Sequence, residues 1–238
     1  MSARHDELAR NLDTVRTRIA DACARAGRAP DEVTLTVVTK FFPASDVRLL
    51  AELGVRHVGE NRHQEAEVKA AELADLGLTW HFVGGLQSNK AASVAAYASV
   101  VESVDRAKLL RGLSRGAHES DRLVDVLVQV SLDPPQPDGG SGDGRSGVPP
   151  DRAADLARRV VEAEGLRLRG VMAVAPPGED PQAGFAKLAR IAADVRAVDP
   201  SATWVSAGMS NDLEAAVESG ATHVRIGSAV LGARPPRR

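Results

Sequence analysis

Eight short β-branched segments alternate with segments of helical periodicity along this chain, and this alternation constrains its fold more than any other feature. The intervening segments, such as ASDVRLLAEL and FAKLARIAADVRAV, are long enough for the helical crossover that parallel strands require. Eight such units in 238 residues favour a closed barrel over an open sheet, so we predict a (βα)8 TIM-type barrel. The strand candidates are LTVVTK, VRHVG, TWHFVG, ASVVES, LVDVLVQVSL, LRGVMAV, TWVSAG and THVRIG.

An additional helix is predicted before the first strand, within a single domain that spans residues 1–238. Large apolar residues recur between Asp6 and Ala26 at spacings of four and three, which places them on one helical face. This helical stripe consists of Leu8, Leu12, Val15 and Ile19.

The barrel pattern is broken by DPPQPDGGSGDGRSGVPP at 133–150, whose composition predicts a flexible surface loop after the fifth strand. A solvated insertion is favoured there over a lid on the barrel mouth.

Charge and composition argue against several classes of protein. The formal net charge is −2 and the charges are interspersed, so we do not expect the basic surface of a nucleic-acid binder. The start, MSARHDELARNL, lacks the apolar core of a signal peptide, and no apolar run is long enough to span a bilayer. We therefore expect a soluble, cytoplasmic protein. A single cysteine, Cys23, and scattered histidines argue against a disulfide framework and against a metal site.

Lys40 is the sharpest single feature, because it closes the otherwise apolar segment LTVVTK. At the end of a barrel strand its ammonium group would point into the mouth of the barrel. Desolvation there lowers the pKa of a lysine and makes its amine a better nucleophile toward an aldehyde. A strand-end lysine that reaches outward to solvent is an equally good interpretation of the position alone.

A second feature follows the seventh strand, in the segment SAGMSNDLEAAVESG. Ser206, Gly208, Met209 and Ser210 form a predicted tight turn that leads into a helix. Small residues before a helix N-terminus leave backbone N–H groups free, which is typical of a phosphate site. An ordinary helix cap at Ser210 explains the same pattern.

The end of the eighth strand carries a third group of candidates, Arg225, Gly227 and Ser228. Gly227 permits a close backbone approach, Ser228 offers a hydroxyl, and the loops after strands seven and eight often bind phosphate in barrels. An inward-pointing Arg225 would face the ring nitrogen of a bound pyridine and keep it unprotonated. The alternative is an ion pair between Arg225 and a loop carboxylate such as Asp212.

Several long motifs in the same order resemble those of one known family. The chain is similar over nearly its whole length to the pyridoxal phosphate homeostasis proteins, relatives of the barrel domain of alanine racemase. It departs from that pattern at Arg62, where an aromatic residue is usual, and at Gly85, where proline is common. The shared motifs are VVTK, GEN at 59–61, QE at 64–65, HFVGGLQSNK at 81–90, RGVMAV at 169–174, GMSNDLEAAV at 208–217 and VRIGSAVLGAR at 224–234.

The resemblance implies pyridoxal 5′-phosphate as the cofactor, bound as a Schiff base on Lys40. It also implies that Arg225 faces the pyridine nitrogen and that Asn61 and Met209 are neighbours in the cofactor pocket. The backbone and hydroxyls that hold the phosphate would be those around Ser206, Ser210, Gly227 and Ser228.

The function that we expect is that of a monomeric cofactor carrier without robust turnover, which makes transient contact with apoenzymes. The alternative is a pyridoxal phosphate-dependent amino-acid racemase, which needs a second acid/base group opposite the lysine. Alanine racemase takes that group from a separate domain, which we expect to be absent because this chain stops at Arg238, directly after its last predicted helix. The single tyrosine, Tyr97, is predicted to precede strand four. A phosphate-ester enzyme on a generic barrel is a third, weaker hypothesis.

Overall fold

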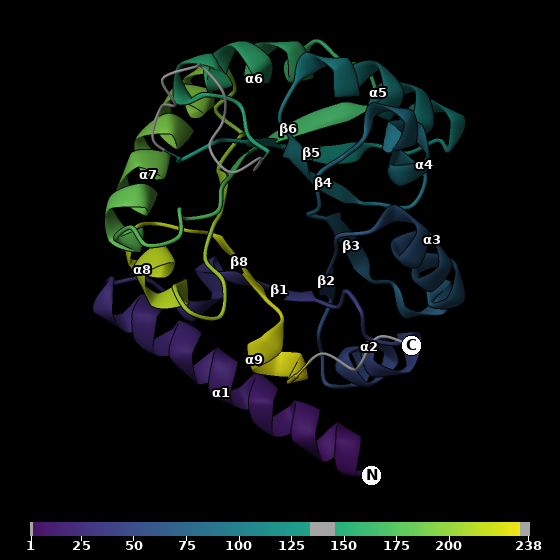
Figure 1. The fold of residues 1–238 in the computed structure, drawn as a ribbon, viewed down its shortest axis with the longest axis vertical. Helices are drawn as coiled ribbons and strands as arrows, with labels where there is room; N and C mark the ends of the chain where they lie inside the picture. Colours follow the sequence, from purple (N-terminus) through teal and green to yellow (C-terminus); the bar gives the residue numbers. More distant parts are fainter. Residues whose placement is uncertain (1, 134–145, 234–238) are drawn as a thin grey trace.

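The computed structural model describes residues 2–133 and 146–233, and these residues form one closed barrel. Eight parallel strands in this part of the chain follow one another in sequence order, and the last pairs with the first (Figure 1). The predicted (βα)8 fold is thus confirmed. The strands are β1 (Thr34–Val38), β2 (His57–Glu60), β3 (Thr79–Phe82), β4 (Val100–Val104), β5 (Val124–Gln129), β6 (Leu166–Met172), β7 (Trp204–Ser206) and β8 (His223–Ile226).

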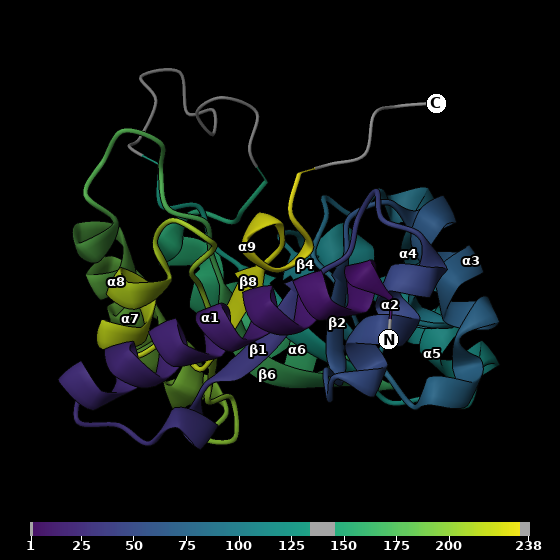
Figure 2. The ribbon, with the colours of Figure 1, turned by 90° about the horizontal axis from the view of Figure 1, so that it is seen from below.

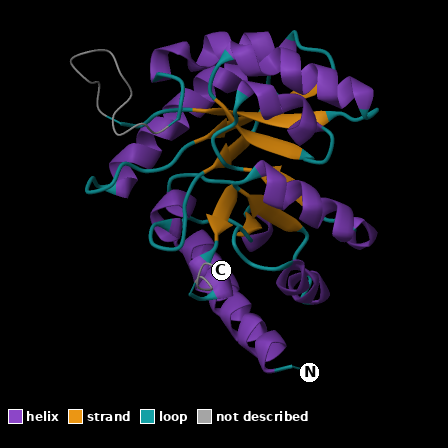
Figure 3. Ribbon diagram, turned by 45° about the vertical axis from the view of Figure 1, so that its right-hand side comes forward, coloured by secondary structure: helices purple, strands orange, loops and turns teal. Residues whose placement is uncertain are grey.

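Helices surround this ring of strands on its outside (Figure 3). They are α1 (Ala3–Arg25), α2 (Ala44–Glu52), α3 (His63–Glu72), α4 (Ala91–Ala95), α5 (Leu110–Glu119), α6 (Ala153–Val161), α7 (Pro181–Val198), α8 (Leu213–Glu218) and α9 (Ser228–Leu231). Short 3-10 turns are η1 (Pro30–Glu32), η2 (Ala74–Leu76), η3 (Ser88–Lys90), η4 (Ala107–Leu109) and η6 (Pro150–Arg152). Within the described ranges, none of these helices is both long and apolar enough to cross a bilayer.

The N-terminal helix α1 is present as predicted and packs along the outside of the barrel beside α8 and α9 (Figures 1 and 2). Ser2 caps it, because the Ser2 hydroxyl accepts a hydrogen bond of 3.2 Å from the backbone N–H of His5. Its predicted apolar stripe, which consists of Leu8, Leu12, Val15 and Ile19, is buried against the barrel, and no member is more than 5% exposed. Burial of this one face holds the helix in place.

Two apolar layers enclose the strands, one around β4 to β7 and one around β1, β2 and α1. The inside of the barrel is different, because strands β3, β4, β7 and β8 each direct a polar side chain inward. These side chains are His81, Glu102, Ser206 and Arg225, and each is 5% exposed or less. A third, small apolar cluster consists of Val100 on β4, Leu127 on β5 and Met172 on β6.

Two predicted boundaries differ from the structure. β1 ends at Val38, two residues before Lys40, because the chain turns at Phe41, which has the left-handed φ of 72°. The helix predicted directly after Ser210 begins at Leu213 instead. Most of the flexible loop predicted at 133–150 lies at 134–145, outside the described residues.

The stability of the fold should depend on the apolar face of α1. We expect Leu12→Ala to lower the free energy of unfolding by about 2–5 kcal/mol, because Leu12 is 1% exposed and its removal leaves a cavity. Urea unfolding followed by circular dichroism measures this change. Leu123→Ala is the matched control, since Leu123 is 55% exposed and should cost about 0.5 kcal/mol or less. Equal losses in the two variants would contradict this account of α1.

Candidate functional site

A cavity of about 610 Å³ opens at the carboxyl ends of β1, β6, β7 and β8. This size lies within the range of about 300–1,000 Å³ that is typical of small-molecule and cofactor sites. The loop at 174–179 after β6 forms one wall, and the segments after β7 and β8 form the opposite one. Of the nine predicted site residues, those that line the cavity are Lys40, Met209, Ser210, Arg225, Gly227 and Ser228.

Lys40 lies in the turn that follows β1 and is half-buried. Thr39, just before it, continues the pairing with β2 through a hydrogen bond of 2.9 Å from its N–H to the carbonyl of Gly59. Phe41, just after it, has a φ of 72°, a conformation that costs a non-glycine residue free energy. The turn therefore directs the Lys40 side chain into the cavity at the expense of local strain.

Arg225 lies at the floor of the cavity and is only 5% exposed. Its guanidinium donates hydrogen bonds of 2.7 Å to Ser206 Oγ and 2.8 Å to the carbonyl of Ala173, and lies 3.8 Å from Glu102 Oε2. Burial lowers the pKa of Arg225, and the carboxylate of Glu102 opposes that effect. The carboxylate within ion-pair distance of Arg225 is thus Glu102 on β4. The loop carboxylate Asp212, the partner that the sequence allows, also raises the pKa of Arg225 through its charge.

Glu102 is the centre of a hydrogen-bonded chain through the barrel interior. It accepts a 2.6 Å hydrogen bond from the Ser206 hydroxyl and a 2.7 Å hydrogen bond from His81 Nδ1. Burial raises the pKa of a carboxyl, but the contacts with His81, Arg225 and Ser206 outweigh it and lower the pKa of Glu102 to about 2. Glu102 is therefore a carboxylate at neutral pH, which balances the buried charge of Arg225.

The chain of hydrogen bonds continues to the first residue of β2. His57 Nδ1 lies 3.0 Å from His81 Nε2. This contact joins His57 to the network around Glu102, and the tautomers of the two rings set which of them donates. These groups were not predicted as a unit, although the lone carboxylate in the apolar strand VVESV was a signal for Glu102.

The two serines of the cavity wall lie side by side. Ser210 Oγ is 3.3 Å from Ser228 Oγ, and the N–H of Ala229 points to Ser210 Oγ at 3.4 Å. Gly227 lets the end of β8 approach β1 closely, since a Cβ there would lie 3.3 Å from the carbonyl oxygen of Val38. Two hydroxyls, a backbone N–H and a side-chain-free position thus converge at one end of the cavity.

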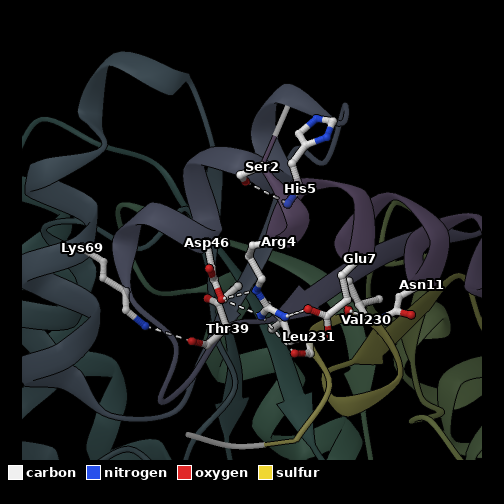
Figure 4. A network of polar contacts seen from close by, with 10 residues as sticks. All are labelled: Ser2, Arg4, His5, Glu7, Asn11, Thr39, Asp46, Lys69, Val230 and Leu231. Carbon is white, nitrogen blue, oxygen red and sulfur yellow. Dashed lines mark hydrogen bonds and ion pairs between the residues drawn. The ribbon is translucent and has the colours of Figure 1, made fainter.

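Helix α1 holds both serine-bearing segments from outside. Arg18 donates 2.9 Å to the carbonyl of Ser210 and pairs with Glu214 at 2.7 Å. At the other segment, Asn11 donates 3.0 Å to the carbonyl of Val230, and Arg4 donates 3.0 Å to the carbonyl of Leu231 (Figure 4). The predicted additional helix therefore supports the serine wall of the cavity.

Three predicted residues do not line this cavity. Ser206 is fully buried beneath it, and its hydroxyl is engaged by Glu102 and Arg225. Gly208 forms the turn after β7 with a φ of 93°, and a Cβ there would lie 2.6 Å from the Cβ of Ala216. Asn61 lines two smaller neighbouring cavities. These residues shape and support the site from behind or beside it.

Comparison with known proteins agrees with this geometry. The family model of the alanine racemase N-terminal domain matches residues 5–235. The pyridoxal phosphate homeostasis protein of Mycobacterium bovis is 42% identical over 247 residues, covering 97% of this chain and 94% of that protein. That of Escherichia coli is 35% identical over 235 residues, covering 96% and 97%. The chain belongs to the pyridoxal phosphate homeostasis protein family.

Solved structures extend the similarity to three dimensions. The structure of PipY from Synechococcus elongatus with PLP bound has a TM-score of 0.80 at 35% identity, covering 94% of this chain and 100% of that one. Alanine racemase from Corynebacterium glutamicum has a TM-score of 0.67 at 16% identity, covering 96% of this chain and 62% of that one. The latter similarity shows a shared barrel fold alone.

One of the positions at which the sequence analysis finds a departure from the family, Arg62, lies beside the lysine turn. Its guanidinium carbon is 5.9 Å from the ring centroid of Phe41. This distance is that of a cation–π contact. In this family member, a cation therefore covers the side chain of Phe41 next to Lys40.

Within the described residues, no three His, Cys, Asp or Glu side chains are grouped as a metal site would require.

Half-buried His57 and buried His223 make the stability of the fold depend on pH. Burial lowers the pKa of His57 from 6.5 to about 4 and that of His223 to about 3. The unfolded chain therefore binds more protons than the folded chain below about pH 6.5, and stability is lost as the pH falls through this window.

We expect the Tm to decrease as the pH falls from about 6.5 to about 4, and His57→Gln to flatten part of this decrease. Differential scanning calorimetry across this range measures both slopes. His118→Gln is the control, because His118 is exposed on α5 and should keep the wild-type slope. A wild-type slope in His57→Gln would show that burial of this ring does not penalise its protonation.

Proposed function

We propose that this family member binds pyridoxal 5′-phosphate as a Schiff base on Lys40 and serves in the intracellular homeostasis or delivery of that cofactor. The observation that carries the proposal is one cavity that unites an amine, a guanidinium and a pair of hydroxyls from three strand ends. These are Lys40 after β1, Arg225 on β8, and Ser210 and Ser228 after β7 and β8. The names of the relatives and the bound cofactor of PipY support the same ligand.

The residues present match the three functional parts of this cofactor. Its aldehyde needs a primary amine, which Lys40 supplies. Its phosphate needs several donors, which the hydroxyls of Ser210 and Ser228 and the backbone after Gly227 supply. Its ring nitrogen needs a defined partner, for which Arg225 lies at the cavity floor. Met209, which is 41% exposed on the cavity wall, is a further neighbour of the ligand.

Arg225 bears on whether the site favours cofactor binding or turnover of amino acids. The bound cofactor supplies an aldehyde carbon for imine exchange and a ring that can withdraw electrons. A guanidinium carries donors and no acceptor, so at the pyridine nitrogen it donates a hydrogen bond and leaves that nitrogen unprotonated. Glu102 and Ser206 hold the guanidinium in this role. An unprotonated ring is a weak electron sink, which favours cofactor binding over turnover of amino acids.

The carrier is therefore preferred to the racemase. Racemisation by two bases requires a second acid/base group on the face opposite the lysine. The single tyrosine of the chain, Tyr97, lies in the turn after α4, where its ring stacks on His63 at 5.9 Å, and it lines a different cavity. We propose a monomeric, cytoplasmic carrier that contacts apoenzymes transiently as it releases the cofactor.

The decisive experiment compares the wild type with Lys40→Ala after incubation with pyridoxal 5′-phosphate and desalting. We expect the wild type to retain an imine absorption band that borohydride reduction abolishes, and Lys40→Ala to retain none. Lys108→Ala is the control, because Lys108 is an exposed lysine in η4. If Lys40→Ala keeps the band, the Schiff base is on another residue. If neither protein binds the cofactor, the phosphate-ester hypothesis takes precedence.

Amino-acid turnover is tested on the same preparation. The loaded wild type is incubated with L-alanine in deuterated water, and incorporation of deuterium at the α-carbon is followed by proton NMR. We expect the α-proton to be retained, since a ring held unprotonated by Arg225 stabilises a carbanion poorly. Rapid exchange together with appearance of D-alanine would favour the racemase.

The phosphate contacts are tested by comparing two ligands. We expect Ser210→Ala/Ser228→Ala to weaken binding of pyridoxal 5′-phosphate about 10–100-fold, because hydrogen bonds to a charged phosphate are lost. Pyridoxal, which lacks the phosphate, should bind the double variant and the wild type alike. Equal weakening for both ligands would mean that these hydroxyls shape the cavity rather than contact the phosphate.

A further inference from the structure

We propose that Lys69, Glu60 and Glu65 form a positioning clamp that presents Lys40 to the cofactor. This inference rests on the proposed role of Lys40. None of the three residues lines the cofactor cavity, so they act through the turn at 39–41 rather than on the ligand. They are called the Lys69 clamp below.

The ammonium group of Lys69 is buried and fully paired. Lys69 lies on α3 and is 6% exposed. Its Nζ donates hydrogen bonds of 2.8 Å to Glu60 Oε1 and 2.7 Å to Glu65 Oε1. The third bond, of 2.9 Å to the carbonyl of Thr39, is drawn in Figure 4. An ammonium has three N–H donors, so each has an acceptor. A buried charge is tolerated only with such complete pairing, which makes the geometry of this group well defined.

The clamp holds both peptide groups that flank the α-carbon of Lys40. The carbonyl of Thr39 belongs to the preceding peptide group and accepts from Lys69. The N–H of Phe41 belongs to the following peptide group and donates to Glu65 Oε1 at 2.6 Å. The backbone of Lys40 is therefore fixed on both sides by one ion-paired cluster.

The same cluster explains how the turn keeps its strained conformation. Phe41 has a φ of 72°, which is unfavourable for a residue with a side chain. The Thr39 hydroxyl adds a further anchor, a hydrogen bond of 2.7 Å to Glu60 Oε1. Such strain persists where the surroundings determine the backbone from several directions. The clamp is thus the structural reason that Lys40 faces the cavity instead of continuing β1.

Glu65 is the best residue to vary. Lys69→Met would leave the carboxylate of Glu60, which is 1% exposed, without its counter-ion, so this variant would confound misfolding with loss of the clamp. The Glu65 side chain is 24% exposed, and its removal frees only the Phe41 N–H and one Lys69 donor. Glu65→Gln keeps an oxygen that can accept both bonds, so it serves as the conservative rescue. Glu72→Ala, an exposed carboxylate at the end of the same helix, is the matched control.

Two readouts are compared at a temperature at which all variants are folded. The first is amide hydrogen exchange at Phe41 in the cofactor-free protein. The second is the affinity for pyridoxal 5′-phosphate, followed by the imine band. We expect Glu65→Ala to accelerate the exchange and to weaken imine formation about tenfold, since a charge-assisted hydrogen bond is lost. Glu65→Gln should recover most of both values, and Glu72→Ala should match the wild type.

Two outcomes would overturn the clamp. Unchanged exchange at Phe41 in Glu65→Ala would show that Glu65 does not hold the turn. Faster exchange with wild-type imine formation would show that the turn does not position Lys40. Failure of the proposed function is recognised separately, because the wild type would then form no imine, or Lys40→Ala would keep the imine, whatever the state of the clamp.

Discussion

A buried ion pair at the centre of the barrel is the constraint on which the rest of the site depends. Arg225 and Glu102 come from β8 and β4, which lie on opposite sides of the closed ring. Removing either charge would take away the counter-charge of a group that is 5% exposed or less, at a large cost in free energy. Ser206 bridges the two and His81 occupies the second carboxylate oxygen, so the guanidinium has one orientation. The cavity floor is therefore a fixed cation.

Two further parts of the cavity lining, the serine wall and the lysine turn, are held from outside the barrel. Helix α1 binds the carbonyl groups of the two serine-bearing segments through Arg4, Asn11 and Arg18. Helix α3 holds the lysine turn through Lys69 and Glu65. Supporting contacts must keep cofactor-binding groups within about 0.5 Å of their productive geometry. Here a loop site acquires that rigidity because α1 anchors its serine wall and α3 anchors its lysine turn.

Much of this arrangement was predictable from local sequence patterns. Helical and strand periodicity predicted the eight strands, the helix α1 and the buried face of that helix, since these depend on residues close in the chain. The placement of Lys40, Arg225, Ser210 and Ser228 at one mouth followed from the rule that strand ends meet in a barrel. The sequence pattern predicts that β1 extends to Lys40, whereas the strand ends at Val38. The difference arises because contacts with α3, and not the local sequence, impose the turn at Phe41.

The sequence by itself determined the periodic elements, their order and the chemical groups available at the strand ends, because each of these is local information. Only the tertiary structure decided which groups pair. Ser206 was predicted beside the phosphate, yet its hydroxyl lies between Glu102 and Arg225, residues 104 and 19 positions away. Such partners are chosen by barrel closure and by the need of every buried charge for a counter-charge, and no short stretch of sequence contains that information.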